Sequence, residues 1–194
     1  MKRAVLLSAA ALICAALLHA VASDDPSRDP VAQFSGDQLV RPEGYREWIY
    51  LSTGLGMNYT PDPGMADQFT NVFVPPWAYH RFLTSGKWPN KTWFVLEDRS
   101  QQSKGSINKG GHFQTDLLGL GVEVKDETRF ADKWAYFNFG NDDKTAPANP
   151  KQACWQCHEN NAAVEHSFVQ FYPTLEPIAQ KFGTYHEHAE AVAH

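Results

Sequence analysis

Alternating apolar and polar positions in the middle of the chain predict four β-strands. The segments are 69–74 (FTNVFV), 92–102 (TWFVLEDRSQQ), 112–126 (HFQTDLLGLGVEVKD) and 133–140 (KWAYFNFG). They are rich in aromatic and β-branched residues, and side chains two positions apart tend to be both apolar or both polar. Both features are typical of strands. The Gly-rich segment 103–111 (SKGSINKGG) predicts a hairpin turn between the second and third strands.

Other stretches have the spacing of helices. Residues 41–54 (RPEGYREWIYLSTG) predict a short amphipathic helix, and residues 77–86 predict a second helix that follows two prolines and ends at Gly86. The apolar face of the first would consist of Tyr45, Trp48, Ile49 and Leu51. Two more helices are expected near the C-terminus, around the cysteine pair and within 167–183. Strands joined by loops, with helices at both ends, predict an α+β domain built on a mostly antiparallel β-sheet.

The N-terminal residues have the pattern of an export signal. Lys2 and Arg3 precede an apolar run, and Ala20 and Ala22 fit a signal-peptidase site. We therefore predict a signal peptide over 1–22 and a periplasmic location in a bacterium. The rest is divided into a flexible lead-in (23–40), the main domain (41–185) and a polar tail (186–194).

Charge and hydropathy exclude two classes of partner for the mature chain. Removal of Lys2 and Arg3 reduces the 17 basic residues to 15, against 22 acidic ones, so the formal net charge becomes −7. No basic run is longer than two residues, which argues against nucleic acid. No hydrophobic stretch after the signal is long enough for a bilayer span, so no membrane partner is expected.

The segment ACWQCH carries a C-x-x-C-H motif made by Cys154, Cys157 and His158. A redox disulfide of the thioredoxin type needs a strand before the motif, but residues 141–153 form a Pro- and Asn-rich loop. A zinc site needs four ligands, and the mature chain has no third cysteine. Neither interpretation finds the partners that it requires.

Covalent haem attachment needs only what the motif supplies. Two thiols one helical turn apart can bond the two vinyl groups of one porphyrin, and the adjacent histidine then binds the iron. The predicted export matches this chemistry, which takes place outside the bacterial cytoplasm. We predict one covalent haem c on a C-terminal helix, held by Cys154 and Cys157, with His158 as the proximal iron ligand.

The export signal, the antiparallel sheet and the single C-terminal motif together resemble the cytochrome P460 family. The specific stretches are SGKWPNKT, KGSINKGGHFQ, VKDETRF and the haem motif followed by FVQFYPTL. The resemblance implies a homodimer with a five-coordinate iron and an open distal face. It also implies one of two functions: hydroxylamine oxidation, as in cytochromes P460 proper, or binding of gases such as nitric oxide, as in cytochromes c′-beta.

A lysine–haem cross-link distinguishes the two functional classes in the family. The family lysine comes from the region that matches YHRFLTSGKWP, where Leu83 or Thr84 occupies the lysine-bearing position here. Lys87 lies a few residues further on and is the candidate for the cross-link only if the register slips; an exposed turn lysine is the favoured interpretation. Lys109 is a weaker candidate.

Further candidates for the distal side come from the residue types alone. His112 and His166 could be distal ligands or proton donors, but the simpler interpretation is a surface or hydrogen-bonding histidine. A charged strand residue could transfer protons during hydroxylamine oxidation, but a solvent-facing charge is again the simpler interpretation. The strand candidates are Glu97, Asp98, Arg99 and Asp116. Two functions of different class stay open: a redox enzyme that passes electrons to a soluble acceptor, or a non-enzymatic protein that binds nitric oxide or carries electrons. A carrier would call for a sixth ligand such as Met57 or Met65.

Overall fold

The computed structural model describes residues 29–57 and 67–187 of the 194-residue chain. The predicted signal peptide, Met65 and the end of the predicted tail from residue 188 lie outside these residues. No helix in the two described stretches combines the length and the apolar character that a bilayer crossing requires.

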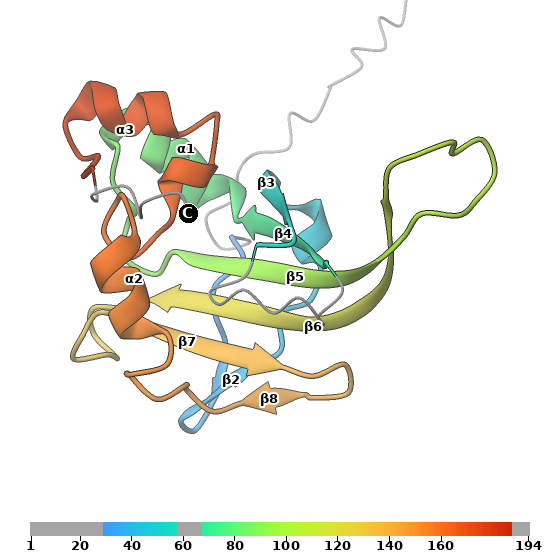
Figure 1. Ribbon diagram of the computed structural model, residues 1–194. Helices are drawn as coiled ribbons and strands as arrows, with labels where there is room; N and C mark the ends of the chain where they lie inside the picture. Colours follow the sequence, from blue (N-terminus) through green and yellow to red (C-terminus); the bar gives the residue numbers. More distant parts are fainter. Residues whose placement is uncertain (1–28, 58–66, 188–194) are drawn as a thin grey trace, which may run out of the picture.

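A five-stranded antiparallel sheet forms the centre of the molecule (Figure 1). Its strands follow one another in chain order: β3 (Ile49–Leu55), β4 (Phe69–Val74), β5 (Trp93–Gln102), β6 (Phe113–Lys125) and β7 (Trp134–Phe139). A second, three-stranded sheet consists of β1 (Phe34–Ser35), β2 (Gln38–Val40) and β8 (Thr145–Ala146). The four predicted strands correspond to β4, β5, β6 and β7, so the α+β class is confirmed.

Three helices gather at one end of the central sheet, while the connection between β5 and β6 projects from the opposite end (Figure 1). They are α1 (Pro76–Ser85), α2 (Trp155–Asn161) and α3 (Glu176–Phe182), and two short 3-10 helices are η2 (Tyr45–Glu47) and η3 (Val169–Phe171). Glycines with φ near +65° follow α1 and α3, at Gly86 and Gly183. This left-handed conformation lets the chain reverse direction and ends both helices.

The central sheet is buried on both faces, and each face has its own apolar cluster. The face toward the helices, called here the helix face, contributes Leu51, Val72, Val74, Phe94, Trp134 and Tyr136 to the first cluster. The opposite face, called the small-sheet face, contributes Trp93, Val95, Leu120, Val122, Val124, Phe137 and Phe139 to the second. Because successive side chains of a strand point to opposite faces, neighbouring residues belong to different clusters.

The predicted helix over 41–54 is wrong. The segment forms η2 and then β3, which pairs antiparallel with β4 and has a register shift between Tyr50 and Ser52. The four apolar residues do not share one face: Tyr45 and Trp48 join the cluster of the small-sheet face, while Ile49 and Leu51 join that of the helix face. Within the range of the predicted lead-in, β1 and β2 form, and Leu39 is fully buried.

Candidate functional site

The C-x-x-C-H motif lies at the start of α2, which packs beside β7. Cys154 is the N-cap residue, and Cys157 and His158 lie within the helix. Both thiols are free and partly exposed. The side-chain amide of Asn149 donates to Cys154 Sγ at 3.3 Å, and that of Asn161 lies 3.7 Å from Cys157 Sγ. The motif therefore presents two unpaired, accessible sulfur atoms on one short helix.

The imidazole of His158 is almost fully buried and is fixed in orientation. Its Nδ1 donates to the backbone carbonyl oxygen of His166 at 2.7 Å, because a carbonyl oxygen can only accept. The rings of Tyr136 and Phe168 flank it, each with its centroid 4.4 Å away. With the proton on Nδ1, the other ring nitrogen, Nε2, carries the lone pair that a metal ion requires.

Three buried polar groups beside His158 have an atom without a hydrogen-bond partner among the described residues. They are Glu123 Oε2, the hydroxyl group of Tyr136 and Nδ1 of His166, and Glu123 Oε1 lies 3.7 Å from His158 Nε2. Burial raises the pKa of Glu123, and the nearby His158 opposes the shift. Burial also raises the pKa of Tyr136, and Glu123 adds to that shift. Unsatisfied buried groups are rare in native proteins and call for an explanation.

The donor set fits a haem c. Two free thiols and a histidine whose Nδ1 is already engaged stand on one helix, and a buried carboxylate oxygen of Glu123 lies 3.7 Å from the histidine Nε2. Second-shell hydrogen bonding of this kind accompanies almost every metal-binding histidine. Among the described residues no cluster of three or more His, Cys, Asp or Glu side chains is placed to hold a separate metal ion.

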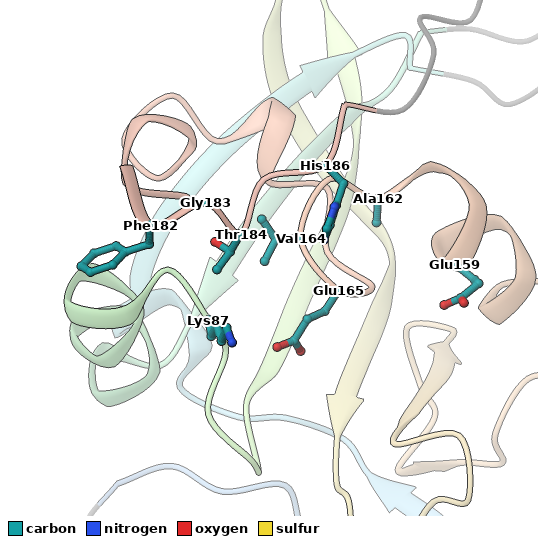
Figure 2. A pocket seen from close by; sticks show the side chains of 9 residues that line it. All are labelled: Lys87, Glu159, Ala162, Val164, Glu165, Phe182, Gly183, Thr184 and His186. Atoms are coloured by element: carbon teal, nitrogen blue, oxygen red, sulfur yellow. The ribbon is translucent and has the colours of Figure 1, made fainter. Parts of the chain in front are cut away.

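A cavity of about 560 Å³ opens beside the C-terminal end of α2 (Figure 2). Lys87 and Glu165 line it, as does Glu159, which follows His158 in the chain. Lys87 is exposed, whereas Leu83 packs against the apolar cluster of the helix face. Thr84 is exposed and donates through its hydroxyl group to the carbonyl oxygen of Arg81. The cross-link candidate thus stands near the motif helix, and its assignment stays a prediction.

The two candidate histidines occupy very different places. His166 is buried next to the motif, but it engages His158 through its backbone, and its Nε2 lies 2.9 Å from a carboxylate oxygen of Glu159. Burial lowers the pKa of the His166 imidazole, while Glu159 opposes the shift. His112 is exposed at the start of β6 and contacts Gln101. Only His166 belongs to the surroundings of the motif.

The charged strand candidates divide between the two faces. Glu97 and Arg99 form an ion pair on the small-sheet face, away from His158. Asp98 lies on the helix face, where it accepts a hydrogen bond of 2.9 Å from Thr70 and where burial raises its pKa. Asp116 lies in the outer part of β6, where its backbone N–H donates to Ser100. Asp98 therefore shares a face of the sheet with the motif histidine, whereas Glu97 and Arg99 do not.

Sequence reasoning missed Glu123 and gave no particular role to Tyr136. A signal for Glu123 was present: it stands between Val122 and Val124 in a strand whose other face is apolar. A carboxylate in that position lies on the face opposite to Val122 and Val124, because alternate residues of a strand share a face. Its proximity to His158 depends on contacts between β6 and α2, which the strand pattern does not contain.

The comparisons with known proteins point to one family. A family model described as cytochrome P460 matches residues 42–169, about two thirds of the chain. The matched range contains the central sheet, α1 and the C-x-x-C-H motif. No curated protein matches the chain.

Proposed function

Since the chain belongs to the cytochrome P460 family, we propose that it is a c-type cytochrome with one covalent haem on Cys154 and Cys157. His158 is its proximal iron ligand, and a small nitrogen compound binds the open side of the iron. The activity that we propose is the oxidation of hydroxylamine. The observation that carries the proposal is the pairing of two free thiols with a histidine whose Nδ1 is held by a carbonyl oxygen.

The residues around the motif have distinct parts in this proposal. Asn149 and Asn161 donate toward the two sulfur atoms and orient them. Tyr136 and Phe168 confine the imidazole between two rings. When bound, the haem supplies the coordination position for the nitrogen ligand and accepts its electrons. Asp98, on the same face of the sheet as His158, is a carboxylate that could take up protons.

The setting of the protein is part of the same proposal. We place it in the periplasm after removal of residues 1–22, with a soluble electron acceptor as its redox partner and with a homodimer as its assembly. The acidic charge of the mature chain, −7, agrees with a role that involves neither nucleic acid nor an anionic membrane surface.

The attachment is tested with the full-length protein, exported in a host that attaches haem c. The intact mass should exceed that of the mature chain by one haem, and a variant with both Cys154→Ala and Cys157→Ala should carry none covalently. His112→Ala, an exposed residue just before β6 that contacts Gln101, is the control and should keep its haem. Covalent haem in the double variant would refute the assignment.

The activity is tested by turnover of hydroxylamine with a soluble electron acceptor. Cleavage of only the two thioether bonds, followed by loss of the whole porphyrin, would show that no lysine is cross-linked. If Lys87 carries the cross-link, Lys87→Ala should release the porphyrin under that treatment, while the native protein retains it.

Nitric oxide binding without turnover is the second candidate. It is favoured by Leu83 and Thr84, which occupy the positions where the family lysine is expected. A protein that binds nitric oxide at the ferrous iron but does not turn over hydroxylamine would support this alternative over the enzyme.

A further inference from the structure

The carbonyl group that holds His158 belongs to a tight turn, Val164–Ser167. Val164 and Ser167 pair with each other across it, with N–O distances of 3.3 and 2.9 Å. Within the turn, Glu165 has φ of +51°, a left-handed conformation that is uncommon for a residue with a side chain. A turn with an unfavourable backbone angle persists only where its surroundings determine it. Residues outside the Val164–Ser167 turn must therefore hold its backbone in place.

One restraint is a tryptophan from the loop after α1. The indole N–H of Trp88 donates to the hydroxyl oxygen of Ser167 at 2.5 Å, and that hydroxyl group donates to the carbonyl oxygen of Val164 at 2.8 Å. Trp88 and Ser167 are both almost completely buried. The ring of Trp88 is itself held between Phe82 and Phe94, at centroid distances of 4.1 and 4.8 Å.

The second restraint is a lysine from the end of β6. Lys125 Nζ donates to Glu165 Oε2 at 2.7 Å and to the backbone carbonyl oxygen of Trp88 at 2.8 Å. Lys125 is buried, with 6 % of its surface exposed. A buried ammonium group must be paired and hydrogen-bonded to be tolerated, and these two acceptors meet that requirement. Lys125 thus joins the Trp88 loop directly to the turn.

We propose that Trp88 and Lys125 are positioning residues for the axial ligand. They hold the Val164–Ser167 turn so that the carbonyl group of His166 accepts the Nδ1 proton of His158. That hydrogen bond fixes the tautomer, sets the ring plane and makes the imidazole a stronger donor to the iron. The inference rests on the proposed haem attachment and assigns a role to two sequence segments, SGKWPNKT and VKDETRF, that the attachment does not use.

The test uses the holoprotein with Lys125→Met, which keeps the length of the side chain and removes its ammonium group. With the turn released, the Nδ1 hydrogen bond weakens and the imidazole donates less charge. The iron–histidine stretching frequency in the resonance Raman spectrum of the ferrous protein should fall, and the reduction potential should rise. Trp88→Phe keeps an aromatic ring and removes the N–H donor, so it should shift both quantities in the same directions.

The control is Lys91→Met, in the same segment as Trp88, SGKWPNKT. Lys91 pairs with Asp126 at 2.5 Å and donates to Thr128, without contacting the turn. It should leave the frequency and the potential at the wild-type values. If Lys125→Met and Trp88→Phe lower the melting temperature but shift neither quantity, the residues only stabilise the fold and the inference is overturned. A wild-type protein without covalent haem would overturn the proposed function as well, so the two failures are distinguishable.

Discussion

The central sheet buries one glutamate on each face, and the two carboxylates are held in opposite ways. On the small-sheet face, Glu97 accepts hydrogen bonds from the hydroxyl group of Tyr45 at 2.7 Å and from Arg46 Nε at 2.8 Å, and a third from Arg99. On the helix face, Glu123 has one oxygen 3.7 Å from His158 Nε2 and the other without a partner among the described residues.

The contrast extends to the pKa values. Burial alone would raise the pKa of Glu97, but the hydrogen bonds from Arg46, Arg99 and Tyr45 outweigh burial and lower it. Nothing comparable offsets burial at Glu123, whose pKa is raised. Each glutamate also has a buried tyrosine nearby. The hydroxyl group of Tyr45 is bonded to Glu97, whereas that of Tyr136 has no partner in the described part of the chain.

This difference separates structure from function within one sheet. A carboxylate with three donors stabilises the fold, because its partners replace the water that it lost. The Glu123 carboxylate oxygen and the Tyr136 hydroxyl group lack such partners, so their presence beside His158 points to a role at the site. The same substitution made on each face should therefore change the free energy of unfolding by different amounts.

The largest difference is expected from Glu→Gln. Glu97→Gln removes the charge that pairs with two arginines and should lower the free energy of unfolding by about 2–3 kcal/mol, less than for a fully buried pair because Arg46 is half-exposed. Glu123→Gln should change it by less than about 1 kcal/mol, since it breaks no hydrogen bond. Urea denaturation at pH 7 measures both. Equal losses would remove the distinction between the two faces.

Tyr→Phe substitutions should also destabilise the protein more on the small-sheet face than on the helix face, by smaller amounts than Glu→Gln. Tyr45→Phe removes a hydrogen bond to a charged acceptor and should lower the free energy of unfolding by about 1.5–2 kcal/mol. Tyr136→Phe removes a hydroxyl group that has no partner, so its effect should stay within about 0.5 kcal/mol. The expected order of the two variants in urea denaturation would be wrong if Tyr136→Phe were the more damaging.

A smaller effect is expected in how the loss of unfolding free energy caused by Glu97→Gln changes with pH. The folded-state pKa of Glu97 lies below the value of 4.5 that applies to the unfolded chain. Its contribution to stability is therefore complete above pH 4.5 and is lost as the pH falls through the folded-state pKa. The difference between wild type and Glu97→Gln should be constant near neutral pH and should shrink below pH 4.5. A difference that grows on acidification would contradict the lowered pKa.

The sequence predicts four of the five strands of this sheet, because β4, β5 and β7 each contain a short run rich in aromatic and β-branched residues. It fails at β3, where the register shift between Tyr50 and Ser52 breaks the alternation. Tyr45, Trp48, Ile49 and Leu51 then imitate a helical face, although they belong to both clusters. A local pattern cannot distinguish a helix from a short 3-10 turn followed by an irregular strand.

The candidate site was predictable only where its residues are consecutive. The C-x-x-C-H motif is a local feature and points to its own chemistry. The surroundings of His158 are not local: Glu123 and Tyr136 come from two strands, and the carbonyl group of His166 comes from a turn whose conformation depends on Trp88 and Lys125. Alternation along β5 requires Glu97 and Asp98 to lie on opposite faces, but alternation alone does not indicate which face the helices cover.

The smallest effect is expected within the Glu97 network itself, where the two arginines differ in exposure. The side chain of Arg46 is 56 % exposed and that of Arg99 is 21 % exposed. Water can replace much of the hydrogen bond and charge that Arg46 offers to Glu97. Arg46→Met should therefore lower the free energy of unfolding by less than about 1 kcal/mol.

Arg99→Met should be more damaging than Arg46→Met, because Arg99 also donates to the carbonyl oxygen of Thr115. Urea denaturation at low and high NaCl compares the two variants. Salt screens exposed charges more than buried ones, so added NaCl should reduce the Arg46→Met loss more than the Arg99→Met loss. If both losses were equal and fell equally with salt, Glu97 would be held by solvent-exposed charges on both sides, and the contrast with Glu123 would rest on Tyr45 alone.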